Sequence, residues 1–331
     1  MKMKYFSIPF YIIFFVLCAI VFSRDIKKDF HESFEVKSGD ILFLTHGDGD
    51  VTVSSWDKDI VEIEVYFSAN VFGVGNDEYD FDITFKQRKN EIEVIENFKS
   101  SHRFGIKGIT INRYEYMIKT PKFLILNLDG DDGNVDIQDM AANIECHLSD
   151  GDIEINHVSA DLIKLDLEDG SLKINDIKGW LDINMDDGDI RIIDYQGETC
   201  NVDMEDGQLD MDRISGSFDI GSDDGDIELH HIQANDLNVS TNDGDIYIDL
   251  EESENPDMVI KADDGKVIID FNREISAKIE IETDDGSIDT NISNPNYEKK
   301  KRNYYNGEIN GGNGKIRIRT NDGDVVLRES N

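Results

Sequence analysis

A short phrase that recurs at near-constant spacing constrains the fold of this 331-residue chain more than any other feature. The phrase is Asp-Gly followed by alternating residues, as in Asp150-Gly151-Asp152-Ile153-Glu154-Ile155. Its glycine falls at positions 133, 151, 170, 188, 207, 225 and 244, in steps of 18, 19, 18, 19, 18 and 19 residues. A period this regular predicts stacked structural repeats between Leu126 and Leu250.

Each repeat is predicted to hold two strands with one buried face. Around Gly170, for example, apolar residues alternate with polar ones from Ile163 to Leu167 and again from Leu172 to Ile174. Alternation with a period of two indicates half-buried strands. The Asp-Gly between the strands is the predicted turn, because Gly accepts positive φ and Asp can bond the nearby backbone.

A second corner follows each pair of strands. A large residue stands seven positions after the glycine and a small one nine positions after it, as Ile177 and Gly179 do. We interpret the large residue as a plug for the corner. The small residue would let the chain turn back into the next repeat.

Two all-β arrangements fit this pattern, namely a parallel β-solenoid with one repeat per coil and a series of antiparallel hairpins. Asp-Gly between alternating strands is also a hairpin signal. The regular period favours the solenoid, because equivalent side chains then stack coil after coil. We therefore expect an all-β, parallel β-solenoid of about 18–21-residue repeats, with hairpin and loop insertions near the N-terminus.

Residues 1–23 are predicted to be a signal peptide. Lys2 and Lys4 precede an apolar run from Phe6 to Phe22, and small residues precede a cleavage point before Arg24. The run is shorter than the ~20 residues that a membrane span needs. The alternative is an uncleaved membrane anchor. The chain is therefore expected to be exported, to the periplasm, to the cell surface or as a secreted protein.

Two regions are expected after the signal peptide. Residues 24–125 should form an N-terminal β region with an opening coil around Gly47-Asp48-Gly49-Asp50 and a hairpin around 87–90. Residues 126–331 should form the solenoid array, ending in a closing repeat from Ile316 to Leu327.

Three stretches are expected to be loops, at 66–80, 97–108 and 293–307. The last carries a basic run from Lys299 to Arg302 beside two tyrosines. It could contact an acidic partner or could simply be solvated.

The two ends of the chain carry a family resemblance. The sequence Phe34-x-Val36, then Gly39, then Gly49-Asp50-Val51-Thr52-Val53-x-x-Trp56-Asp57-x-Asp59, resembles the start of a bacterial family of β-strand repeat proteins. That family is a domain of unknown function labelled "putative adhesins". Pro121 and Gly311-Gly312-x-Gly314 are similar to its later pattern. The resemblance covers roughly residues 30–328. It implies a right-handed β-helix-like fold and an extracytoplasmic location, and it transfers no catalytic residue.

The aspartates of the turn are the candidate metal ligands. In a solenoid they would stack at about 4.8 Å, where two like charges repel by about 0.9 kcal/mol even in bulk water. Diffuse counterions could offset this repulsion, and so could bound Ca²⁺, which takes six to eight oxygen ligands. The candidate Ca²⁺ ligands are Asp187, Asp189, Asp224 and Asp226.

Composition and motifs narrow the function. The net charge of -38 argues against a nucleic-acid partner and against a polyanionic substrate. No Ser-His-Asp, H-E-x-x-H or phosphate-loop pattern occurs, so no catalytic residue is proposed. We expect a non-enzymatic protein with a structural or adhesive role at the envelope or surface. Its partner would be an unknown envelope or surface protein or glycan, and it would contact the membrane only through an uncleaved N-terminal segment. The alternatives are a Ca²⁺-stabilised surface binding module and a carbohydrate-active β-helix enzyme.

Four single residues test the repeat model. Cys146 and Cys200 both take inward positions three repeats apart, so stacking would separate them by about 14 Å. That distance is too long for a disulfide, and we expect buried free thiols. Trp56 and Trp180 are interpreted as corner and core residues.

Overall fold

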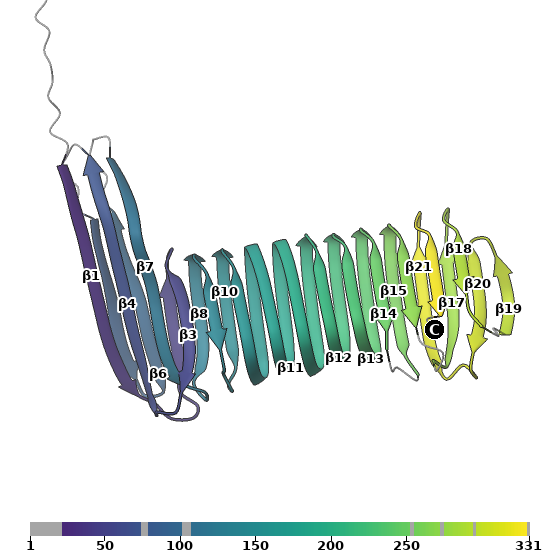
Figure 1. Ribbon diagram of the computed structural model, residues 1–331, viewed down its shortest axis with the longest axis horizontal. Coiled ribbons are helices and arrows are strands. Elements are labelled where there is room, and N and C mark those ends of the chain that lie inside the picture. The colour runs from purple at the N-terminus through teal and green to yellow at the C-terminus, as the bar shows by residue number, and fades with distance from the viewer. Residues whose placement is uncertain are drawn as a thin grey trace, which may run out of the picture.

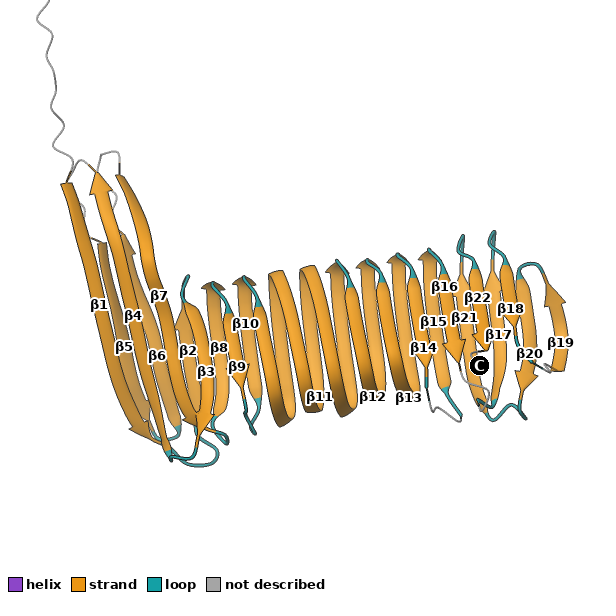
Figure 2. Ribbon diagram, viewed as in Figure 1, coloured by secondary structure: helices purple, strands orange, loops and turns teal. Residues whose placement is uncertain are grey.

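The computed structural model describes residues 22–73, 79–100, 107–251, 255–271, 275–293 and 296–329. They form one 22-stranded sheet wound into a long rod (Figures 1 and 2). Every regular element in these ranges is a strand, and they contain no helix with the length and hydropathy of a membrane span. The predicted signal peptide lies outside them, except that its last two residues begin the first strand.

The centre of the rod is a parallel β-solenoid. Its strands are β8 (Ile125–Asp132), β9 (Val135–Gln138), β10 (Ile144–Asp150), β11 (Ile153–Asp206), β12 (Leu209–Asp224), β13 (Ile227–Asp243) and β14 (Ile246–Leu250). Ile144 lies opposite Leu126 on one side and opposite Ile163 on the other, in parallel pairs. The predicted solenoid is therefore confirmed, and the alternative of antiparallel hairpins is wrong for this part of the chain.

The core is a narrow column of stacked side chains. The inward residues Ile163, Leu165 and Leu172 are completely buried, and so is the corner residue Ile177. Polar residues alternate with them on the outside. Trp180 differs from its prediction, because its side chain is 47% exposed on the array surface.

At the N-terminal end, the coil nearest the chain start does not form the outermost layer. The strands of this end are β1 (Phe22–Glu35), β2 (Ile41–His46), β3 (Asp50–Trp56), β4 (Ile60–Gly73), β5 (Tyr79–Arg88), β6 (Glu91–Ser100) and β7 (Lys107–Pro121). β2 pairs in parallel with β6 on one side and β8 on the other, while β3 lies between β7 and β9. The coil that the sequence predicts to open the solenoid is thus inserted one layer inside it.

Antiparallel strands cover β6 and β7, which themselves lie parallel over the inserted coil. β4 pairs with both β1 and β7, and β5 with β6. β1 and β4 have 14 residues and β7 has 15, against 7 in β10. These long strands rise above the turn edge of the array, as Figure 1 shows at the purple end of the rod.

The C-terminal end repeats this arrangement. Its strands are β15 (Asp257–Asp264), β16 (Val267–Phe271), β17 (Ala277–Thr283), β18 (Ile288–Asn291), β19 (Asn296–Lys301), β20 (Tyr304–Ile309), β21 (Gly314–Thr320) and β22 (Val325–Glu329). β21 lies between β15 and β17, and β22 lies between β16 and β18. The predicted closing repeat is therefore inserted before the preceding coil, and the antiparallel β19–β20 hairpin covers β17.

The three predicted loops are shorter than expected. β4 continues to Gly73 and β5 begins at Tyr79; β6 continues to Ser100 and β7 begins at Lys107. The stretch 293–307 is mostly the β19–β20 hairpin. In these stretches, residues whose polar composition had indicated loops pair with neighbouring strands at the ends of the rod. The hairpin predicted around 87–90 is confirmed as β5 and β6.

A column of glycines sets how closely the coils stack at the Asp-Gly turn. A Cβ atom placed on Gly170, at φ +139°, would lie less than 3.0 Å from the carbonyl oxygen of Gly151 in the preceding coil. The same contact recurs along the rod, and at the C-terminal end it runs from Gly265 to Gly323 and then to Gly286. The inserted coil thus takes its regular place in the column.

The opposite corner uses residues other than glycine in the left-handed conformation. The residue before each corner plug has φ between 51° and 60° in this series: Asp139, His157, Asp176, Asp194, Arg213 and His231. Asp and His tolerate this conformation better than most residues do. The sequence pattern predicted the large residue at the corner but not the left-handed residue that precedes it.

We expect Gly170→Ala to destabilise the rod by about 2–4 kcal/mol, because the new methyl group is both strained and in collision with the backbone. The matched control is Gly221→Ala, whose Cβ would meet no backbone atom and only two side-chain oxygens, Asp203 Oδ1 at 3.2 Å and Ser240 Oγ at 3.9 Å. Urea unfolding of both variants measures the difference. Equal stability of the two variants would contradict the tight stacking.

Candidate functional site

The turn aspartates form the column that the sequence predicts. Asp224 is paired with Asp206 in one neighbouring coil and with Asp243 in the other. All three side chains are exposed. For the exposed Asp169, desolvation and then the neighbouring Asp187 and Asp150 raise the pKa of the carboxyl above its ordinary value. Desolvation and the like charges of the column therefore both disfavour ionisation of this carboxyl.

The aspartates after the glycine have a structural role. Asp226 Oδ1 accepts a hydrogen bond from the backbone N–H of Asp245 in the next coil at 2.8 Å, and Asp189 Oδ1 accepts one from Gln208 at 3.2 Å. Asp152 accepts equivalent bonds from both the N–H and the hydroxyl of Ser171. These carboxylates connect successive coils at the turn.

The four candidate Ca²⁺ ligands form two separate pairs. Asp187 and Asp189 flank Gly188, whereas Asp224 and Asp226 flank Gly225, and the coil that contains Asp206 lies between them. Two coils span about 9.6 Å, so one ion cannot bridge the two pairs. Calcium binding at either pair stays a prediction.

The net charge lies almost entirely in the array. Residues 126–256 contain 5 Lys and Arg and 37 Asp and Glu, a net charge of -32. Residues 1–125 and 257–331 each carry a net charge of only -3. The rod therefore has a strongly acidic middle and two nearly balanced ends.

Cys146 and Cys200 are both free and buried, as the repeat model predicts. Burial raises the pKa of the Cys146 thiol to about 12 and also raises that of Cys200. They act as small apolar residues. Of the basic run, Lys301 and Arg302 are exposed, while the side chains of Lys299 and Lys300 lie outside the described part of the structure.

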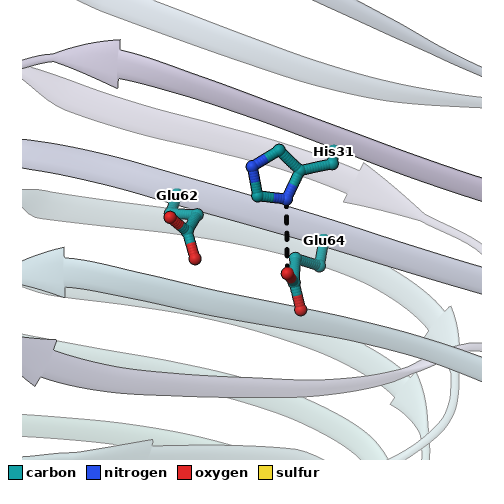
Figure 3. A group of neighbouring side chains, drawn as sticks. All are labelled: His31, Glu62 and Glu64. Atoms are coloured by element: carbon teal, nitrogen blue, oxygen red, sulfur yellow. Dashed lines mark hydrogen bonds and ion pairs between the residues drawn. The ribbon is translucent and has the colours of Figure 1, made fainter.

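Among the described residues, one group has metal-ligand spacing, and Figure 3 shows it on the outer face of β1 and β4. The ligand atoms of His31, Glu62 and Glu64 lie within 4.8 Å of one another. His31 Nδ1 is 3.2 Å from Glu64 Oε1, and the Tyr66 hydroxyl donates to Glu64 Oε2 at 2.9 Å. Cross-strand pairing on an exposed surface accounts for the group.

A cavity of about 320 Å³ lies where the long end strands rise above the first turns. We call it the N-terminal notch, and its lining residues are Thr45, His46, Gly47, Asp48, Phe67, Glu96, Phe98, Ile111, Tyr114 and Asp131. β4 and β7 contribute one wall, β6 contributes the other, and the turn after β2 forms the base. The sequence pattern did not predict the N-terminal notch.

A buried polar network supports the base of the notch. Glu96 Oε2 accepts hydrogen bonds from the Gly47 N–H and the Tyr116 hydroxyl, both at 2.7 Å. His46 is 4% exposed, and its ring occupies the space left by Gly130 in the next coil. Burial lowers the pKa of His46 below its ordinary value, although Glu96 acts in the opposite direction. The imidazole is therefore neutral near pH 7.

Two polar atoms of this network have no hydrogen-bond partner. They are Nε2 of His46 and the hydroxyl oxygen of Tyr114, both buried. Burial, and then the Glu96 carboxylate, raise the pKa of Tyr114 above its ordinary value. Buried polar atoms without partners are uncommon in native proteins, and here both belong to residues that line one cavity.

Aromatic rings form the apolar part of the notch. Phe67 stacks on Phe81 with ring centroids 4.2 Å apart, and Tyr114 meets both edge-on at 5.2 and 5.3 Å. Phe98 lies 6.0 Å from Phe67 and remains 43% exposed. A Cβ on Gly49 would collide with the rings of Tyr114 and Tyr116, so this glycine lets the rings reach the turn.

Comparison with known proteins identifies one family. The model of the family described as Toastrack DUF4097 matches residues 42–217 and, in a second overlapping match, residues 181–328. No curated protein matches the chain in sequence.

Two solved structures are similar over most of their length. One is described as a "putative adhesin" from Bacteroides fragilis, with 12% identity, coverage of 91% of this chain and 97% of that chain, and a TM-score of 0.34. The other is described as a "putative cell adhesion protein" from Clostridium sporogenes, with 13% identity, coverage of 92% and 100%, and a TM-score of 0.19.

The raised pKa of Asp169 predicts how stability depends on pH. A carboxyl whose pKa is higher in the folded state favours folding when protonated, and this contribution is lost as pH rises through the folded-state pKa. We expect Asp169→Asn to raise the melting temperature at pH 7 in low salt, and to have no such effect at pH 3 or in 0.5 M NaCl.

Asp161→Asn is the matched control, because Asp161 is an exposed aspartate outside the turn column. Differential scanning calorimetry at both pH values measures the effect. If the two variants melted alike at pH 7, repulsion within the column would have no effect on stability.

Proposed function

This chain belongs to the Toastrack DUF4097 family, and from that premise we propose that it is an exported, non-enzymatic protein with a structural or adhesive role at the cell envelope. The observation that carries the proposal is the charge distribution along the rod. A middle section with a net charge of -32 separates two ends of nearly balanced charge.

The geometry suits a spacer. Each added coil lengthens the rod by about 4.8 Å, and close backbone stacking at the glycine column resists bending. A strongly acidic surface repels other acidic surfaces and polymers. A rod of this kind would remain extended and hold its two ends apart in an acidic envelope.

Residues of the N-terminal segment support export. Lys2, Lys4 and the apolar run that ends at Phe22 have the pattern of a signal peptide. The first strand begins at Phe22, next to the predicted cleavage point before Arg24. Removal of the segment would therefore leave almost all of β1 in place.

We expect the chain, carrying a C-terminal epitope tag, to be recovered outside the cytoplasm of its own host with Arg24 as its first residue. N-terminal sequencing after cell fractionation measures this, and a variant lacking residues 2–23 is the control. Full-length chain in the cytoplasm would overturn export. A host without the chain should also lose either attachment to surfaces or resistance to detergent, which separates an adhesive role from a structural one.

A Ca²⁺-stabilised surface module is the second candidate. The observation that favours it is the raised pKa of Asp169, which results from desolvation and then from repulsion by the stacked carboxylates of Asp187 and Asp150. A divalent cation would relieve that repulsion. Asp189 and Asp226 each use one carboxylate oxygen to accept a backbone hydrogen bond, and their second oxygens would be ligands.

Thermal unfolding in EDTA, in millimolar Ca²⁺ and in millimolar Mg²⁺ tests this candidate. For a spacer whose carboxylates are only screened, we expect a small and equal rise in melting temperature with both ions. A large rise with Ca²⁺ alone would establish the second candidate. Asn substitution at 187, 189, 224 and 226 should then abolish that rise.

A further inference from the structure

We propose that the N-terminal notch binds an alkylammonium group, supplied by a free amine or by a lysine side chain of a partner. This binding activity goes beyond the proposed envelope role and does not depend on it. The cavity volume of about 320 Å³ lies at the lower end of the range of small-ligand sites. Its position beside the array turns leaves it accessible from the side of the rod.

The polar groups of the notch accept hydrogen bonds. His46 Nδ1 lies 3.0 Å from the carbonyl oxygen of Gly47. A carbonyl can only accept, so Nδ1 carries the proton, and the unpartnered Nε2 is an acceptor that lies against Gly130 of the neighbouring coil. Asp48, Glu96 and Asp131 add carboxylates to the lining. A ligand that matches this set must be rich in donors, and an ammonium group has three donors and no acceptor.

The charge of the notch selects the same ligand. Its described lining contains three carboxylates and neither lysine nor arginine. Burial, and then Asp132 and Glu96, raise the pKa of Asp48 above its ordinary value, because no cation balances these groups. A bound cation would supply the missing charge. The acidic array next to the notch would also attract cations and repel anions.

The aromatic wall suits the rest of the ligand. Phe67, Phe98 and Tyr114 place rings around the cavity, and ring faces attract ammonium groups. Ile111, which is 40% exposed, offers an apolar contact for an alkyl arm. A neutral sugar fits less well, because its hydroxyl groups need donors as well as acceptors. Among the described lining side chains, the hydroxyls of Thr45 and Tyr114 are the available donors.

The test is a ligand-detected NMR titration of the full chain in 150 mM NaCl, which screens diffuse attraction to the array. The probes are butylammonium and Nα-acetyl-lysine amide. Their uncharged counterparts are butanol and Nα,Nε-diacetyl-lysine amide. We expect both charged probes to saturate one site and the uncharged counterparts to bind at least tenfold more weakly.

Variants assign the binding to the notch. Phe98→Ala should weaken it by roughly twofold to thirtyfold, the span of cation–π attraction from exposed to desolvated sites, and Asp48→Asn should weaken it as well. The matched controls are Trp180→Ala and Asp206→Asn, which remove an exposed aromatic ring and a turn aspartate from the array. Melting temperatures confirm that each variant is folded.

Each result decides the proposal. Equal binding of charged and uncharged probes, unchanged affinity in both notch variants, or an equal loss in the array controls would overturn it. Equal affinity for the two charged probes would support a site for any alkylammonium group, including a free amine. Tighter binding of the lysine derivative would support a partner's lysine side chain.

Discussion

The spacing of hydrogen-bonded strands is the constraint on which the rest of this rod depends. Parallel strands lie about 4.8 Å apart, and at the Asp-Gly turn this distance leaves no room for a Cβ between successive coils, as Gly170 over Gly151 shows. Glycine is required there by backbone contact as well as by conformation. The same spacing stacks the neighbouring aspartates, so the turn that permits close packing also concentrates negative charge. The carboxylates after the glycine offset part of that cost, because Asp226 and its equivalents accept backbone hydrogen bonds from the next coil.

The two ends resolve a problem that the repeating middle does not have. A solenoid ends in open strand edges, and open edges can pair with other chains. At each end, a coil inserted out of sequence order lies beneath a parallel coil, and antiparallel strands cover that outer coil. At the N-terminal end, β4 and β7 are longer than the array strands. The part of these two strands that extends beyond the array forms one wall of the notch. The strands that close the N-terminal end of the rod therefore also form the one described place where aromatic rings, carboxylates and a buried histidine meet.

Local alternation predicted the array well, because each residue of a coil faces inward or outward according to a period of two. The alternation did not predict the strand pairing at the two ends of the rod, where paired strands are distant in the sequence. The stretch 293–307 has the composition of a loop, yet pairing with β17 makes it a hairpin. The notch combines residues from 45 to 131 and could not be predicted from spacing. One signal was available: Gly130 occupies a position where the following coils have Leu148 and Leu167, and the missing side chain makes room for His46.

The insertion of β21 between two earlier strands makes completion of the rod depend on a segment that is synthesised after both of its partners. While the chain emerges from the ribosome, β15 and β17 have no partner between them until β21 has been made. A product truncated before Gly314 would retain two unpaired parallel edges. Such edges are sticky and would mark the product for aggregation or proteolysis. The topology thereby distinguishes molecules that contain β21 and β22 from fragments that lack them, which is a form of quality control that follows from the order of the strands.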